Sequence, residues 1–139
     1  MKNSYQSLCD AFEGDRRSTL VSKLVDQYQW QPEKASKAID EYVMFLYIAS
    51  LNIGVHLVPT QDIDCVWETD ILQSTAQYVQ TCQTLCGQII HHIGTAEMQK
   101  VHTPAGAEAA FAKTKALFRQ YFGQTSLCGE LSPAACGLL

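Results

Sequence analysis

The densest group of chemically capable side chains lies between positions 62 and 70, where carboxylates flank a tryptophan. The group comprises Asp62, Asp64, Glu68 and Asp70, with Trp67 between them. Carboxylate oxygens are hard ligands for calcium or magnesium. A calcium-binding loop, however, needs Gly at its sixth position and Glu at its twelfth, and counting from Asp62 these positions hold Trp67 and Gln73. On a helix Asp64 and Glu68 share one face, whereas Asp62 and Asp70 point elsewhere, and Asp62 and Asp64 also suit a helix N-terminus.

A second combination joins thiols to imidazoles in the order Cys82-x3-Cys86-x4-His91-His92. Four such ligands could form a tetrahedral zinc site, although zinc knuckles usually place their cysteines two residues apart in a loop. Adjacent side chains on a helix point about 100° apart, so His91 and His92 cannot both face one ion. The same divergence separates Glu68 from Asp70. We therefore expect no resident metal or cofactor, and we expect Cys82 and Cys86 to be core thiols without a disulfide between them.

The elements that position these residues are predicted to be helices. Apolar residues at helical spacing, with capping residues at the ends, predict helices over about 4–12, 19–29 (capped by Ser18), 32–52, 63–86 (with a break near 73–74) and 104–122. The run from Tyr42 to Ala49 is apolar all round, which is typical of a helix covered on several sides. No alternating run bounded by turn residues predicts a strand.

These elements predict an all-α, single-domain orthogonal helical bundle of about five to six helices around a central apolar helix. The helical domain spans residues 1–123, and residues 124–139 form a tail with Cys128, Cys136 and several leucines, which we expect to dock on the bundle. Trp67 is expected to be mostly buried, with Ile63 and Ile71 on the same face.

Composition excludes several classes of protein. The chain has 139 residues, a formal net charge of −4, 47% hydrophobic residues and 17% charged residues. These values argue against a disordered chain and against a nucleic-acid binder, which needs a basic surface. The adjacent Arg16 and Arg17 are expected to be solvated. No apolar run is long enough for a membrane span, and the first residues have no apolar signal segment, so a cytoplasmic location with reduced thiols is expected.

The central segment resembles the "glycine-rich domain-containing protein-like" family of largely uncharacterised helical domains. The resemblance covers about residues 40–92 and is carried by Val58-Pro59-Thr60-x-Asp62-Ile63-Asp64-x-x-Trp67, then Ile71-Leu72, Tyr78, Cys82, Leu85, Gly87 and His91-His92. The family pattern continues Trp-His-x-His where this chain has Trp67-Glu68-Thr69-Asp70, so both histidines are replaced by carboxylates. If the histidines of relatives bind a metal, the resemblance implies that this chain has lost that function or shifted it toward oxygen ligands.

Two classes of function remain open. The first is a non-catalytic protein-interaction module for an unidentified partner, because no complete catalytic group and no nucleotide-binding glycine loop is present. The alternative is a metal-dependent enzyme or metal-binding module that uses carboxylates and histidines around Trp67 and His91/His92. The candidate site residues for partner binding or the family motif are Asp64, Trp67, Glu68, Asp70, Tyr78, His91 and His92.

Overall fold

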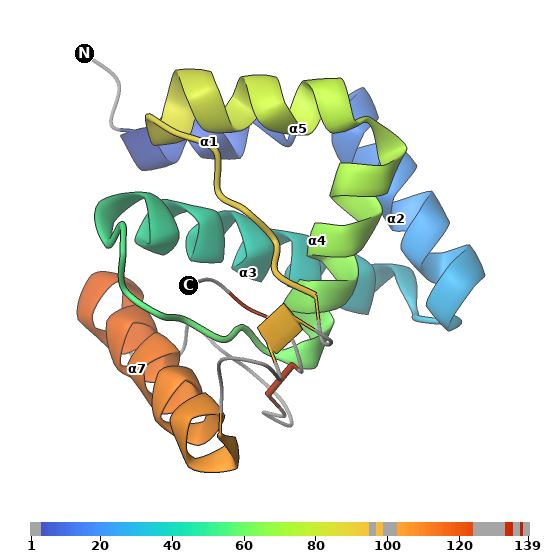
Figure 1. The fold of residues 1–139 in the computed structure, drawn as a ribbon. Helices are drawn as coiled ribbons and strands as arrows, with labels where there is room; N and C mark the ends of the chain where they lie inside the picture. The colour runs from blue at the N-terminus through green and yellow to red at the C-terminus, as the bar shows by residue number, and fades with distance from the viewer. Residues whose placement is uncertain (1–3, 95–96, 99–102, 124–132, 135–136, 138–139) are drawn as a thin grey trace.

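The described part of the chain forms one all-α domain (Figure 1). The computed structural model describes residues 4–94, 97–98, 103–123, 133–134 and 137. Its helices are α1 (Ser4–Ala11), α2 (Asp15–Tyr28), α3 (Pro32–Leu51), α4 (Gln61–Gln73), α5 (Thr75–Thr81) and α7 (Pro104–Phe122), with a π-helical turn η1 (Cys82–Cys86) directly after α5. Within these residues the extended pairing is confined to two isolated bridges, so the predicted all-α class is confirmed.

Helix α3 is the centre of the domain, as its apolar sequence predicts. Pro32 occupies the first turn and Glu33 places a negative charge at the positive end of the helix dipole. Tyr42, Phe45 and Leu46 are fully buried. The helix contacts α1, α2, α4, α7 and η1, and Figure 1 shows α4 running across α3 instead of alongside it. This steep crossing agrees with the predicted orthogonal arrangement.

Side-chain caps define the ends of the α4–α5 region. The Thr60 hydroxyl accepts a hydrogen bond from the Ile63 amide, and the Ser74 hydroxyl accepts one from the Gln77 amide. Each cap satisfies a backbone donor that has no partner within its helix. The predicted break near 73–74 is therefore confirmed, and Gly87, with φ of 84°, ends the following turn. The expectation of a regular helix through Cys86 is wrong, because residues 82–86 form a π-helical turn.

Three residues separate the end of α1 from the start of α2, so α2 begins earlier than a cap at Ser18 predicts. Its first residue is Asp15, and Gly14 precedes it with φ of 66°, a backbone conformation that glycine adopts without steric cost. The Ser18 hydroxyl lies inside the helix and donates to the Gly14 carbonyl. A glycine turn, and not a side-chain cap, therefore sets the start of α2.

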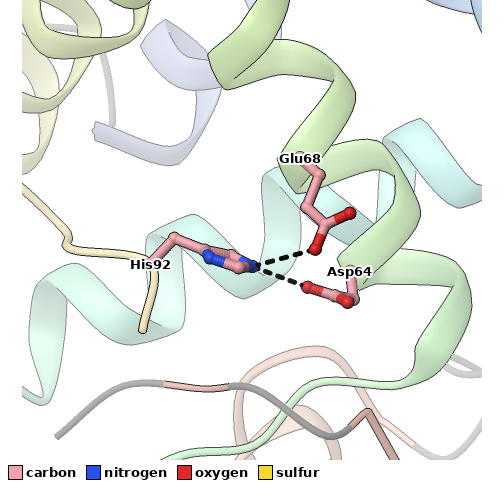
Figure 2. A group of neighbouring side chains, drawn as sticks. All are labelled: Asp64, Glu68 and His92. Atoms are coloured by element: carbon pink, nitrogen blue, oxygen red, sulfur yellow. Dashed lines mark hydrogen bonds and ion pairs between the residues drawn. The ribbon is translucent and has the colours of Figure 1, made fainter. Parts of the chain in front are cut away.

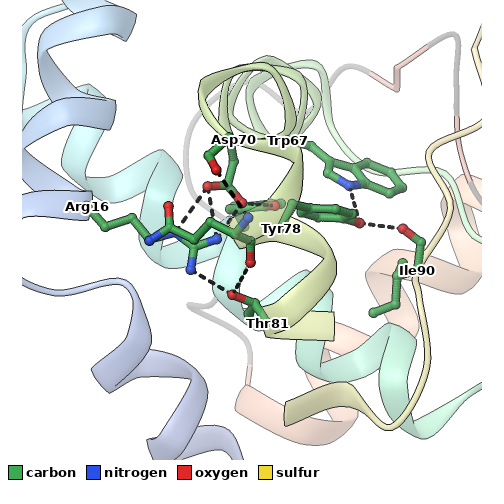
Figure 3. A network of polar contacts seen from close by, with 9 residues as sticks. Arg16, Trp67, Asp70, Tyr78, Thr81 and Ile90 are labelled. Atoms are coloured by element: carbon green, nitrogen blue, oxygen red, sulfur yellow. Dashed lines mark hydrogen bonds and ion pairs between the residues drawn. The ribbon is translucent and has the colours of Figure 1, made fainter. Parts of the chain in front are cut away.

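The early start of α2 places Arg16 inside the domain, so the expectation of a solvated Arg16 is wrong. Its guanidinium donates to both carboxylate oxygens of Asp70 at 3.0–3.2 Å and to the Thr81 hydroxyl at 2.8 Å (Figure 3). The Tyr42 hydroxyl donates to Asp70 at 2.8 Å. Only 6% of the Arg16 side chain and 1% of the Asp70 side chain are exposed. This buried network joins α2, α3, α4 and α5.

Three described residues of the C-terminal tail lie against the bundle. The Ala134 amide donates to the Pro59 carbonyl, and Gly137 exchanges two backbone hydrogen bonds with Ile93. Ala134 is buried beside Val58 and Phe111. These contacts agree with the expected docking, whereas Cys128, Cys136 and the tail leucines lie outside the described residues. In the part of the chain that is described, no helix combines the length and apolar character of a membrane span.

We predict that Asp70→Ala lowers the free energy of unfolding by about 3–5 kcal/mol, because it leaves the Arg16 guanidinium buried without its carboxylate. Urea unfolding followed by circular dichroism measures this loss. The double variant Arg16→Met/Asp70→Leu removes both charges and is expected to recover part of the stability. A loss below about 1 kcal/mol for Asp70→Ala, the level of an ordinary surface substitution, would contradict a buried ion pair.

Candidate functional site

Helix α4 sends its carboxylates to three different places. Asp70 points into the domain toward Arg16, and Asp62 lies near the surface, 3.8 Å from the Lys34 ammonium group. Asp64 and Glu68, one helical turn apart, share a third face. The divergence predicted from the helical spacing is therefore confirmed, and the face with two carboxylates is the one that meets a histidine.

Asp64, Glu68 and His92 form a compact group of potential ligand atoms (Figure 2). The His92 Nε2 atom lies 2.8 Å from Asp64 Oδ1 and 3.7 Å from Glu68 Oε1. One ligand atom from each residue falls within 4.8 Å of the others. The side chains of His92 and Asp64 are 15% and 20% exposed, and that of Glu68 is 49% exposed, so the group is half-buried and open to solvent on the Glu68 side.

The buried Trp67 positions His92. The indole has no exposed surface, and the imidazole packs edge-to-face against it with ring centroids 4.6 Å apart. Because Trp67 lies between Asp64 and Glu68 in the same turns of α4, the imidazole that packs on it faces both carboxylates. The expected burial of Trp67 is confirmed. Ile63 is buried on the same helix, and Ile71 is half-buried against the core.

A short chain of hydrogen bonds holds the segment that carries His92. The Trp67 indole N–H donates to the Tyr78 hydroxyl at 2.9 Å, and the Tyr78 hydroxyl donates to the Ile90 carbonyl (Figure 3). Tyr78 and Ile90 are 4% and 3% exposed, so these polar groups have no water to replace their partners. These hydrogen bonds tie the backbone at Ile90, two residues before His92, to α4 and α5.

Burial controls the protonation of the carboxylates on α4. Burial is the main cause of the raised pKa of Glu68, the Asp64 charge adds to it, and His92 opposes it. Burial likewise raises the pKa of Asp70, while the Arg16 guanidinium and the Tyr42 hydroxyl oppose the rise. A nearby positive charge would therefore stabilise the ionised form of Glu68, as the Arg16 guanidinium already does for Asp70.

Several candidate residues lie away from this group. His91 is exposed and lines a groove with Ile53 and Ile89, whereas His92 is half-buried beside Asp64. Cys82 and Cys86 are buried in the core, so the Cys82-x3-Cys86-x4-His91-His92 sequence does not form one site. Asp70 and Tyr78 serve as supports: Asp70 anchors α4, and Tyr78 anchors the His92 segment.

The sequence alone did not single out Asp64, Glu68 and His92 from the other candidate site residues. The available signal was the i, i+4 spacing of the two carboxylates, which marks one face of α4. Nothing in the sequence indicates which of the two adjacent histidines turns toward that face. The role of the Ile90 carbonyl was missed, because backbone acceptors leave no trace in residue type.

Two carboxylate oxygens and one imidazole nitrogen match the donor set of a first-row divalent metal ion. Such ions hold oxygen and nitrogen ligands at about 2.0–2.2 Å, so two ligands of one ion lie up to about 4 Å apart. The three atoms lie within 4.8 Å of one another, which is close to this spacing. Comparison with family models, with curated proteins and with solved structures finds no match to this chain.

We predict that Tyr78→Phe lowers the free energy of unfolding by about 1–3 kcal/mol, because it leaves the Trp67 indole N–H and the Ile90 carbonyl buried without partners. Hydrogen exchange at the amides around His92 is expected to accelerate in the same variant. Tyr121→Phe is the matched control, since the Tyr121 side chain reaches solvent. Equal stability of the two variants would contradict the anchoring role of Tyr78.

Proposed function

We propose that this protein is a divalent-metal-binding helical domain whose ligands are Asp64, Glu68 and His92. The observation that carries the proposal is the convergence of the three ligand atoms within 4.8 Å on the wall formed by Trp67. An imidazole combined with carboxylates favours Mn²⁺, Fe²⁺ or Zn²⁺ over Ca²⁺ and Mg²⁺, which prefer oxygen ligands throughout.

The objections raised from the sequence do not apply to this set of ligands. His91 and His92 diverge, and so do Glu68 and Asp70, but one member of each pair is enough when Asp64 supplies the third ligand. We therefore prefer a metal-binding function over the interaction module without metal that the sequence favoured. In the resembled family, position 68 carries a histidine, so Glu68 supports an exchange of one ligand type for another at that position.

Three protein ligands with an open side are typical of a site that keeps a coordination position for water or a substrate. Glu68 is the most exposed of the three side chains, and the open side lies next to it. A closed structural site would have four protein ligands. The proposed site thus suits binding or activation of a small oxygen-containing ligand more than structural support.

A His92–Asp64 hydrogen bond that only stabilises the fold is the alternative to a metal site. A substitution at Glu68 distinguishes the two. Glu68 is half-exposed and 3.7 Å from His92, so Glu68→Gln leaves the 2.8 Å His92–Asp64 contact in place. A purely structural contact predicts no effect of Glu68→Gln on metal affinity, whereas the proposed site loses a ligand.

We predict that Mn²⁺ or Zn²⁺ added to chelator-treated protein at a hundred times its Kd raises the free energy of unfolding by about 2.7 kcal/mol. Glu68→Gln is expected to weaken the affinity at least about tenfold, because losing even a residue that supports a metal ligand has effects of this size. Asp62→Asn removes a charge from the same helix but lies outside the group, and it should bind metal like the unaltered protein. Urea unfolding with and without the metal measures the stability gain, and isothermal titration calorimetry measures the affinity of the unaltered protein and of the two variants. Equal affinity of the two variants would contradict the site.

The affinity is also predicted to fall with decreasing pH. Metal binding requires ionised carboxylates and a free imidazole nitrogen, so bound protons compete with the ion. The raised pKa of Glu68 extends this competition above the usual range of a carboxyl group. Titrations at about pH 7.5 and about pH 5.5 should show weaker binding at the lower pH, with proton release on binding. A pH-independent affinity would exclude these three ligands.

A protein-interaction module remains the second candidate, and one observation favours it. Leu51 and Ile53 are 49% and 51% exposed at the end of α3. Ile53 lines a groove of about 340 Å³ with Ile89, Ile90 and Ile93. In a binding assay, a partner that docks in this groove should bind the Ile53→Asp variant more weakly and the Glu68→Gln variant as well as the unaltered protein. The opposite pattern would place the partner at the metal site.

A further inference from the structure

A cleft between α2 and α4 adjoins the proposed metal site. It encloses about 370 Å³, which lies within the usual range of small-molecule pockets. Its lining includes Lys23, Asp26 and Tyr28 from the last turns of α2, and Glu68, Thr69 and Leu72 from α4. Glu68 belongs both to this cleft and to the Asp64–Glu68–His92 group. A molecule in the cleft therefore lies next to the open side of the metal site.

The helical positions on α4 explain why Glu68 serves both sites. Asp64 lies about 40° from Glu68 around the helix axis, on the side that meets His92. Leu72 and Thr69 lie about 40° and about 100° from Glu68 in the opposite direction, on the side of α2. Figure 2 shows one Glu68 oxygen directed toward His92 and the other turned away from it. The metal site and the cleft are thus neighbouring faces of one helix, with Glu68 at their boundary.

The inner part of the cleft is packed, and its charged groups lie at the rim. Thr69 is buried, and its hydroxyl donates to the Cys65 carbonyl at 2.7 Å. Tyr28 is half-buried against the core. Lys23 and Asp26 are exposed on the α2 side. A ligand in the cleft therefore meets one ammonium group and one carboxylate group on the wall opposite Glu68.

Metal binding changes which charges are available to such a ligand. A divalent cation is neutralised by the Asp64 and Glu68 carboxylates, yet it keeps open coordination positions for further oxygen ligands. The Lys23 ammonium group forms charge-assisted hydrogen bonds with carboxylates. The ion and Lys23 thus attract carboxylate oxygens from the two walls of the cleft, whereas Asp26 opposes a negative ligand. Two such attachment points suit a ligand with an acidic group at each end.

We propose that the α2–α4 cleft binds a small dicarboxylic acid in its ionised form. One carboxylate fills the open coordination position beside Glu68, and the other pairs with Lys23. The hydrocarbon between them packs on Leu72, whose side chain is an apolar surface at the rim and is 82% exposed in the free protein. This inference rests on the proposed metal function, because the ion supplies one of the two attachment points.

Calorimetric titration of malonate, succinate and glutarate into the manganese-loaded full chain tests the proposal. These probes differ in the number of methylene groups between their carboxylates, so they sample different distances between the ion and Lys23. At least one of them is expected to bind saturably to the loaded protein, and none to the protein without metal. Propionate, which has a single carboxylate, is expected to bind more weakly than the best dicarboxylate.

Substitutions on α2 test the sign of the charge that the cleft recognises. Lys23→Gln is expected to weaken the affinity for the best probe about three- to tenfold, the range for one ion pair in a partly exposed site. Its Mn²⁺ affinity should stay unchanged, because Lys23 is not a metal ligand. Asp26→Asn is expected to strengthen probe binding, since it removes a like charge. Lys113→Gln is the matched control: it removes the same charge from α7, which does not line the cleft, and should bind the probe normally.

Failure of this inference is distinguishable from failure of the metal site. A protein that binds Mn²⁺ but none of the three dicarboxylates would overturn the inference and leave the metal site in place. Equal loss of probe affinity in Lys23→Gln and Lys113→Gln, or no loss in Lys23→Gln, would overturn it as well. So would probe binding without metal, or weaker binding after Asp26→Asn. Absence of Mn²⁺ binding in the unaltered protein would remove both the metal site and the inference.

Discussion

A carboxylate with 1% of its side chain exposed must be satisfied entirely by protein groups, and Asp70 finds its partners on two other helices. Arg16 of α2 supplies a bidentate pair and also binds Thr81 of α5, while Tyr42 of α3 supplies a hydroxyl. Burying such a pair gains little net stability, but leaving either charge alone is costly. The network therefore selects one arrangement of the helices around α4.

That arrangement determines what the remaining face of α4 can do. With Asp70 directed inward and Trp67 packed beside Phe45, the helix cannot rotate, and Asp64 and Glu68 are left on the face that meets residues 88–93. The Trp67–Tyr78–Ile90 hydrogen bonds bring this segment to the helix and set His92 on the indole. An apolar wall on one side and solvent on the other give the three ligands a partly desolvated setting, in which attraction between a cation and two carboxylates is stronger than in water.

Sequence reasoning recovered the features that depend on local chemistry. The helix break near 73–74 and the apolar run around Tyr42 each depend on a few neighbouring residues, so their effects are visible in the sequence. It failed for Arg16, because burial of a charge depends on a partner 54 residues away. It could not choose between His91 and His92 for a similar reason: the orientation of a non-helical segment is set by distant hydrogen bonds. The π-helical turn at Cys82–Cys86 likewise has no signature in residue type.

The central claim is that α4 and the His92 segment together form one metal site built from oxygen and nitrogen ligands. X-ray absorption spectroscopy of the zinc-loaded protein tests it directly, because scattering from oxygen or nitrogen differs from scattering by sulfur. The account predicts ligands at about 2.0–2.2 Å, with the outer-shell scattering of a single imidazole ring and no sulfur. Sulfur scattering at about 2.3 Å would place the metal on the Cys82–Cys86 pair and contradict the account.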